Sequence, residues 1–154
     1  MKSIKPFNEF IKEGIVKLQS PNKSRAEFLI NESERGYLFL LDLLKKFKIT
    51  NINANDFVKS CYDILMEIIR AKMLLDGYNA TGYGAHEAEV SYLRILGFSE
   101  NEVQFTDQIR FFRNGMLYYG TALDKQYAEK VIEFIKRIYP KLKGMAKINK
   151  DKQL

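Results

Sequence analysis

The feature that most constrains the fold is a stretch of helical periodicity between Asn53 and Leu75. Apolar residues recur there every three or four positions in two neighbouring stripes, and polar residues occupy the remaining face. A helix with two adjacent apolar stripes packs against neighbours on two sides, as in the interior of a helical bundle. The first stripe is Phe57, Cys61, Ile64, Ile68, Ala71 and Leu75, and the second is Val58, Tyr62, Leu65 and Ile69.

The start of this helix carries its own signals. Asn53 is a residue type that caps the first turn, and Asp56 follows near the positive end of the helix dipole. Ile52 precedes the cap, and we expect it to pack against Phe57 as a hydrophobic staple. The helix is therefore predicted to begin at Asn53.

The same periodicity predicts further helices. Ser99 and Glu102 form a capping box, and Gly97 closes the preceding helix in the left-handed conformation. Pro21 suits the first position of a helix that starts near Ser20, in which Gly36 costs roughly 1 kcal/mol. We expect long helices at about 20–47, 53–75, 99–119 and 124–140 or slightly beyond, and short ones at about 7–18 and 85–96.

No alternating strand pattern extends beyond a few residues. The glycine-rich stretch "DGYNATGYGAHE", residues 76–87, lacks the lysine and the preceding strand of a Walker phosphate loop, and its turn residues suit a connection between two helices. The fold class predicted is all-α, an antiparallel bundle of four main helices plus one or two short helices.

Length and composition narrow the class of protein. A chain of 154 residues suits a single domain, residues 1–154, with a basic tail from about residue 144. We expect no membrane span, because the longest apolar run, "GYLFLLDLL", is short and contains Asp42. The N-terminus lacks the apolar segment of a secretory signal, and a single cysteine, Cys61, excludes a disulfide framework. These features favour a soluble, cytoplasmic protein.

The chain has a formal net charge of +6, which favours an anionic partner. The charge is concentrated, however, since five lysines and one aspartate from Tyr139 onward contribute +4 of it. A basic tail of this kind is either a solvated terminus or an arm that docks on a partner.

One polar cluster stands out, in "RFFRNGMLYYG", residues 110–120. Arg110, Arg113 and Asn114 are spaced by three and four residues, so they project from one helix face. The cluster is either a solvated stripe, with Arg110 paired to an acid such as Asp107, or a functional site.

The helix order and the residues around this cluster resemble the HEPN family (higher eukaryotes and prokaryotes nucleotide-binding domains). The resemblance covers roughly residues 20–143, and residues 70–120 are its most specific part. In that family an arginine is often followed by asparagine, and a histidine comes after four to six intervening residues. Arg113 and Asn114 match the first two positions, whereas Tyr118, Tyr119 and Gly120 occupy the three places where the histidine is expected.

The resemblance implies a two-fold dimer in which the motif helices meet. Many family members are metal-independent ribonucleases, some are toxins paired with a small nucleotidyltransferase, and others bind nucleotides or proteins without activity. Family membership alone therefore does not decide the function.

Metal-independent RNA cleavage needs a base for the 2′-hydroxyl and a cation for the phosphate. Arg113 suits the second role, because its guanidinium binds phosphate in a bidentate fork. Tyr118 is a poor base, since its reference pKa is near 10. His86, the single histidine of the chain, is a further candidate if the preceding helix brings it to the site. Its alternative role is packing or capping at a helix start.

We therefore predict Arg113 and Tyr118 as catalytic residues, with His86 as a further candidate, and Arg110, Arg113, Asn114 and Tyr119 as nucleic-acid or nucleotide contacts. No cofactor or metal site is expected, and Asp63 with Glu67 is interpreted as a solvated face. The protein is predicted to be a homodimer and the HEPN component of a toxin–antitoxin pair with a nucleotidyltransferase partner. It is expected to bind RNA or a nucleotide, with ribonuclease activity weak or absent. The alternative is a non-catalytic helical interaction module in which the same residues build an interface.

Overall fold

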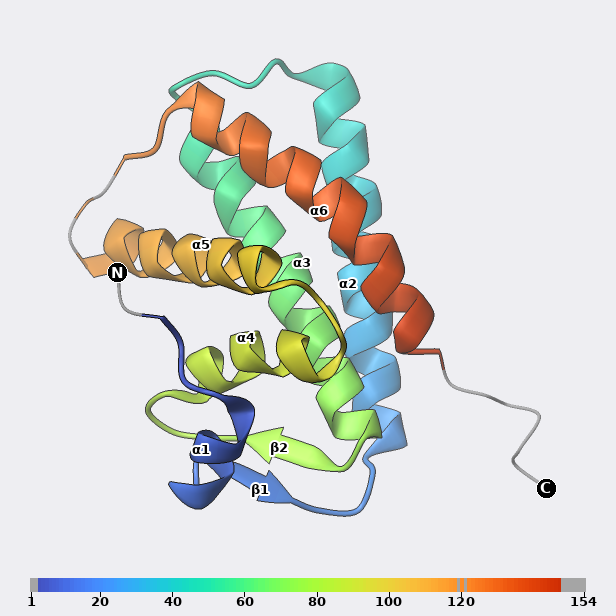
Figure 1. The fold of residues 1–154 in the computed structure, drawn as a ribbon. Helices are drawn as coiled ribbons and strands as arrows, with labels where there is room; N and C mark the ends of the chain where they lie inside the picture. The colour runs from blue at the N-terminus through green and yellow to red at the C-terminus, as the bar shows by residue number, and fades with distance from the viewer. Residues whose placement is uncertain (1–2, 119, 121, 148–154) are drawn as a thin grey trace.

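The computed structural model describes residues 3–118, 120 and 122–147, and the fold is an all-α bundle, as predicted. Helix α3 (Ala54–Leu75) runs through its middle and contacts α2 (Lys23–Lys46), α4 (Ala85–Ile95), α5 (Glu100–Tyr118) and α6 (Lys125–Met145) (Figure 1). Helices α2 and α3 are antiparallel neighbours, and α5 crosses α3 (Figure 1). Both apolar stripes predicted for α3 contribute to the core, which explains its central position.

The N-terminal segment differs from the helix expected at 7–18. Helix α1 (Phe7–Lys12) is followed by Gly14 with a φ of 77°, a left-handed conformation that ends the helix. The chain then forms strand β1 (Val16–Leu18), which pairs antiparallel with β2 (Tyr78–Ala80) in the register Val16–Ala80. The glycine-rich connection after α3 thus supplies a strand, which the local pattern did not predict.

Helix α2 is capped by Asn22, whose Oδ1 accepts a hydrogen bond of 3.2 Å from the backbone N–H of Arg25. It therefore begins slightly later than the predicted start near Ser20, and Pro21 lies outside it. Gly36 is explained by helix packing, because a Cβ atom there would lie 3.0 Å from Cγ1 of Ile64 on α3. The missing side chain allows α2 to approach α3 closely.

Asn53 occupies the N-cap position of α3, as predicted, but its side chain binds the preceding loop instead of the helix. Its Oδ1 accepts from the N–H of Thr50 at 2.8 Å, and its Nδ2 donates to the carbonyl of Lys48 at 2.9 Å. The hydrophobic staple predicted for Ile52 is wrong, because that side chain is 94% exposed.

The capping box and the left-handed glycine predicted before α5 are confirmed. The Ser99 N–H donates to Glu102 Oε1 at 2.9 Å, and the Glu102 N–H donates to Ser99 Oγ at 3.2 Å, which completes the capping box. Gly97 has a φ of 89° immediately after α4.

Helix α6 begins after Asp124, whose Oδ1 accepts from the N–H of Tyr127 at 2.8 Å, and it continues past Pro140. Leu142 and Ala146 are buried, so the chain remains packed beyond the point where the basic tail was expected to start. Residues 148–154 lie outside the described part of the chain. Among the described helices, none combines the length and the apolar character needed to cross a membrane.

Candidate functional site

A cavity of about 420 Å³ lies where α3, the start of α4 and the end of α5 meet. We call it the Arg113 cavity. It brings together three residues predicted from sequence, Arg113, Asn114 and His86, with residues of α3 that sequence reasoning did not assign to a site. Its lining residues are Tyr62, Asp63, Met66, Glu67, Arg70, His86, Arg113 and Asn114.

The guanidinium of Arg113 is unusual in this cavity. Its Nε and Nη1 atoms are buried and have no hydrogen-bond partner among the described residues. A buried charged donor without a partner loses its hydration without compensation, which costs more than a neutral group would. The unpaired Nε and Nη1 therefore favour an anionic partner that the described residues do not provide.

Tyr62 presents a second unpaired donor. Its side chain is buried, at 7% exposure, and its Oη atom has no partner among the described residues. Burial, reinforced by the negative charge of Glu89, raises the pKa of Tyr62 to about 12. The hydroxyl therefore stays protonated at neutral pH and can donate a hydrogen bond into the cavity.

Glu89 organises one wall of the cavity from a buried position on α4. Its carboxylate accepts two hydrogen bonds from Arg70, from Nε at 2.6 Å and from Nη2 at 3.1 Å. Burial disfavours the charged guanidinium, but the hydrogen bond and charge of Glu89 outweigh it and raise the pKa of Arg70. This bidentate pair fixes Arg70 at the cavity wall.

Glu89 also contacts His86, whose Nδ1 lies 2.9 Å from Oε1 of the carboxylate. A carboxylate accepts at this contact, so Nδ1 carries the hydrogen and Nε2 of the neutral ring keeps a lone pair. The His86 side chain is 58% exposed, which leaves the ring accessible to a ligand. The arrangement combines a potential base with a carboxylate that orients it.

Two carboxylates of α3, Asp63 and Glu67, complete the lining. Asp63 is exposed, in agreement with the solvated face predicted, but both side chains border the cavity, which was not predicted. Desolvation at the cavity wall raises the pKa of Asp63, against the opposing charge of Arg113. Desolvation and the charge of Asp63 also raise the pKa of Glu67. The cavity thus offers hydrogen-bond acceptors beside its cations.

Arg110 does not line the cavity. Its Nε donates to Asp107 Oδ1 at 2.7 Å, which confirms the predicted pairing, and its Nη1 lies 3.8 Å from Glu87 Oε1. Asp107 is buried and belongs to the same helix, and the contact with Glu87 links Arg110 to α4. Two carboxylates balance the charge of Arg110, which weakens its case as a nucleic-acid contact.

The side chains of Tyr118 and Tyr119, predicted as catalytic and binding residues, lie outside the described part of the structure. Sequence reasoning missed Tyr62, Arg70 and Glu89. The i, i+3 spacing of His86 and Glu89 was available as a signal, whereas the burial of Tyr62 and the approach of Arg70 to Glu89 depend on the packing of α3 against α4.

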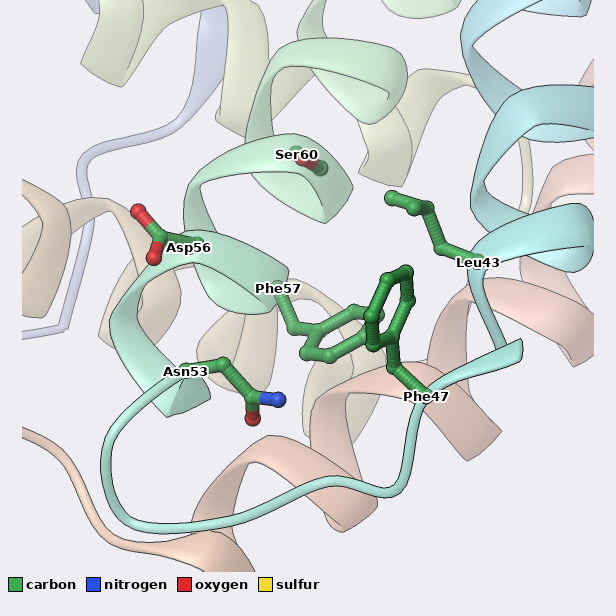
Figure 2. Close-up of a pocket in the computed structure, with 6 residues that line it drawn as sticks. All are labelled: Leu43, Phe47, Asn53, Asp56, Phe57 and Ser60. Atoms are coloured by element: carbon green, nitrogen blue, oxygen red, sulfur yellow. The ribbon is translucent and has the colours of Figure 1, made fainter. Parts of the chain in front are cut away.

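Other features of the described residues offer fewer groups that could bind a ligand or react. Within 3–118, 120 and 122–147 there is no group of three or more His, Cys, Asp or Glu residues that suits a metal ion. Burial raises the pKa of Cys61 to about 12, so its thiol is not a nucleophile at neutral pH. A smaller hollow of about 210 Å³, the Phe47 hollow, lies between the end of α2 and the start of α3 and is mainly apolar (Figure 2).

Comparison of the chain with models of protein families, with curated proteins and with solved structures finds no match. The resemblance to the HEPN family therefore stays a prediction from sequence.

Proposed function

We propose that the Arg113 cavity binds a phosphate group of RNA or of a nucleotide. The observation that carries the proposal is the pair of buried Arg113 nitrogen atoms that have no hydrogen-bond partner within the described part of the chain. Both nitrogens carry N–H groups, and each N–H of a charged guanidinium can donate to a phosphate oxygen. The Tyr62 hydroxyl and the guanidinium of Arg70 supply further donors for the same anion.

We further propose that the protein is a HEPN-like homodimer and the HEPN component of a toxin–antitoxin pair with a nucleotidyltransferase. This assignment rests on the sequence resemblance around Arg113 and Asn114. It agrees with a phosphate site in the cavity where Arg113 lies, since RNA and nucleotides share that chemistry.

Ribonuclease activity in this proposal is weak, and His86 supports whatever activity exists. Its Nε2 can accept the proton of a ribose 2′-hydroxyl while Glu89 stabilises the imidazolium that forms. The activated oxygen attacks the adjacent phosphorus, the bond to the 5′-oxygen breaks, and that oxygen takes up a proton. The chain has no second histidine to supply this last proton, which is why we expect slow cleavage.

The test is binding of a fluorescein-labelled single-stranded RNA, measured by anisotropy. Arg113→Ala should weaken binding about 10- to 100-fold, because it removes a charge-assisted hydrogen-bonding contact worth about 1.5–3 kcal/mol. Arg25→Ala is the matched control, since Arg25 is exposed and the charge change is the same. Equal affinities of the two variants would contradict the phosphate site.

A second candidate is the non-catalytic interaction module, and the surface of α2 favours it. Phe28, Leu38 and Phe39 are each more than half exposed on this one helix. Exposed apolar side chains that gather on one element are typical of protein interfaces. In this role the protein would bind a partner through α2 and show no affinity for RNA.

A further inference from the structure

The Phe47 hollow is formed by apolar side chains that project from two helices. Figure 2 shows Leu43, Phe47 and Phe57 pointing into one space with Asn53 at its edge, while the Asp56 carboxylate is directed away from the rings. Phe47 is 58% exposed, although it borders the hollow. The volume of about 210 Å³ is suited to one inserted side chain, rather than to a whole small molecule.

The loop that carries this surface, residues 47–53, is held in a defined conformation. Besides the hydrogen bonds of Asn53 described above, Thr50 Oγ1 accepts from the N–H of Ile52 at 3.2 Å. Asn51 Oδ1 accepts from the N–H of Lys125 at 2.8 Å, which ties the loop to the start of α6. An ordered loop loses little conformational entropy on binding, so its exposed apolar side chains, Phe47 and Ile52, are preorganised for a partner.

Positive charge surrounds the same loop. A second hollow, of about 440 Å³, shares Phe47 with the first and is lined by Lys45, Lys46, Lys48 and Lys125. The first three lysines are exposed and form no ion pair with any described residue, and the ammonium of Lys125 lies 3.8 Å from Glu129.

Favourable interaction with helix dipoles explains the positions of only some of these lysines. Lys45 and Lys46 lie in the last turn of α2, where a cation is favourable. Lys125 lies at the first position of α6, where the dipole disfavours a cation, and Lys48 lies in the loop. The shared location of these lysines around Phe47 is therefore better explained by an external acidic partner.

We propose that this surface binds an acidic segment of another protein, which inserts one apolar side chain between Phe47 and Phe57 and places its carboxylates near the lysines. Charge complementarity selects this occupant. A second copy of the chain would bring the same positive charge, and residues 148–154, with two lysines and one aspartate, carry a net positive charge too. The apolar lining of the hollow suits the inserted apolar side chain of a peptide, which a phosphodiester backbone does not have.

The proposal is independent of the phosphate site, because the two surfaces share no lining residue. The probe is a synthetic peptide, Glu-Glu-Leu-Glu-Glu-Phe-Glu-Glu, added to the ¹⁵N-labelled full chain and followed by NMR. We expect shifted amide signals in residues 43–60 and around Lys125, with unchanged signals at the Arg113 cavity.

Two variants test the two halves of the contact. Phe47→Ala should remove the anchor, and Lys45→Glu with Lys48→Glu should remove the charge attraction, so each should weaken binding about tenfold or more. The control is Lys17→Glu with Lys23→Glu, an equal charge change at exposed positions away from the loop. The amide spectrum of each variant also reports whether it remains folded.

The proposal would be overturned if the peptide shifted no amide signals of the parent protein. It would also be overturned if a peptide with lysine in place of glutamate caused equal shifts, or if both loop variants bound the acidic peptide as tightly as the parent. Larger shifts of the same signals with single-stranded RNA would assign the surface to nucleic acid instead.

Discussion

His86 and Arg70 share one buried carboxylate: Glu89 Oε1 lies 2.9 Å from His86 Nδ1 and 3.1 Å from Arg70 Nη2. The carboxylate therefore orients a potential base and a fixed cation on the wall of the cavity. The same cavity contains Arg113, whose Nε and Nη1 have no hydrogen-bond partner among the residues that the structure describes. This arrangement separates binding from proton transfer, because different side chains serve each task.

Replacing the histidine should abolish cleavage without abolishing binding. His86→Ala removes the Nε2 acceptor but leaves Arg113, Tyr62 and Arg70 in place, so RNA affinity should change less than about threefold while residual cleavage falls by about 10² or more. Cleavage is measured on labelled RNA in the presence of a chelator. Cleavage that persists in His86→Ala would exclude the histidine as the base.

Tyr118→His should raise ribonuclease activity, because it restores histidine at the spacing from Arg113 that the family pattern has. Adding Arg113→Ala to the same variant should remove the gain by eliminating phosphate stabilisation. Circular dichroism first establishes that each variant is folded. A folded Tyr118→His protein that cleaves no better than the parent would refute the prediction.

Glu89→Gln should destabilise the fold, since it leaves the partly buried Arg70 without its anionic partner. We expect a loss of about 2–4 kcal/mol in the free energy of unfolding, measured by urea denaturation. Glu100→Gln is the matched control. Its pair with Arg94 lies at the surface, and its loss should be below about 1 kcal/mol. Similar losses for the two variants would show that the buried Glu89–Arg70 pair stabilises the fold no more than the surface pair does.

Cys61 should be unreactive in the folded protein, because its thiol is buried and its pKa is raised to about 12. At a pH of about 8, Ellman's reagent should label it only as fast as the chain unfolds. Ionisation of this thiol also makes the stability of the fold depend on pH. An unfolded thiol ionises near pH 8.5, so the contribution of Cys61 to stability is complete below that pH and is lost as pH rises towards 12. Rapid labelling under native conditions would contradict the burial.

Light scattering should report a dimer, twice the chain mass of 18.0 kDa, if the motif helices meet across a two-fold axis. Phe111 is 54% exposed on α5, and Phe111→Glu should then produce a monomer. Phe28→Glu, at an exposed position on α2, is the control. A dimer disrupted by Phe28→Glu alone would place the interface on α2 and favour the interaction module.

The elements that the sequence predicted well depend on neighbours along the chain. The capping box of Ser99 and Glu102, the left-handed Gly97 and the pairing of Arg110 with Asp107 involve residues only a few positions apart. Such interactions form within a single helix or at its end, so the spacing of residue types is sufficient to predict them. The all-α class followed in the same way from the periodicity of the helices.

Tertiary structure decided the rest. Strand β1 has three residues and forms only because β2, from beyond α3, pairs with it, and the exposure of Ile52 reflects a loop held by Asn53 and Thr50. The Arg113 cavity combines Tyr62 and Arg70 of α3 with His86 of α4 and Arg113 of α5. Spacing along the chain contains no distance between separate helices, so packing alone brings these side chains together and leaves the Arg113 nitrogens without a partner among the described residues.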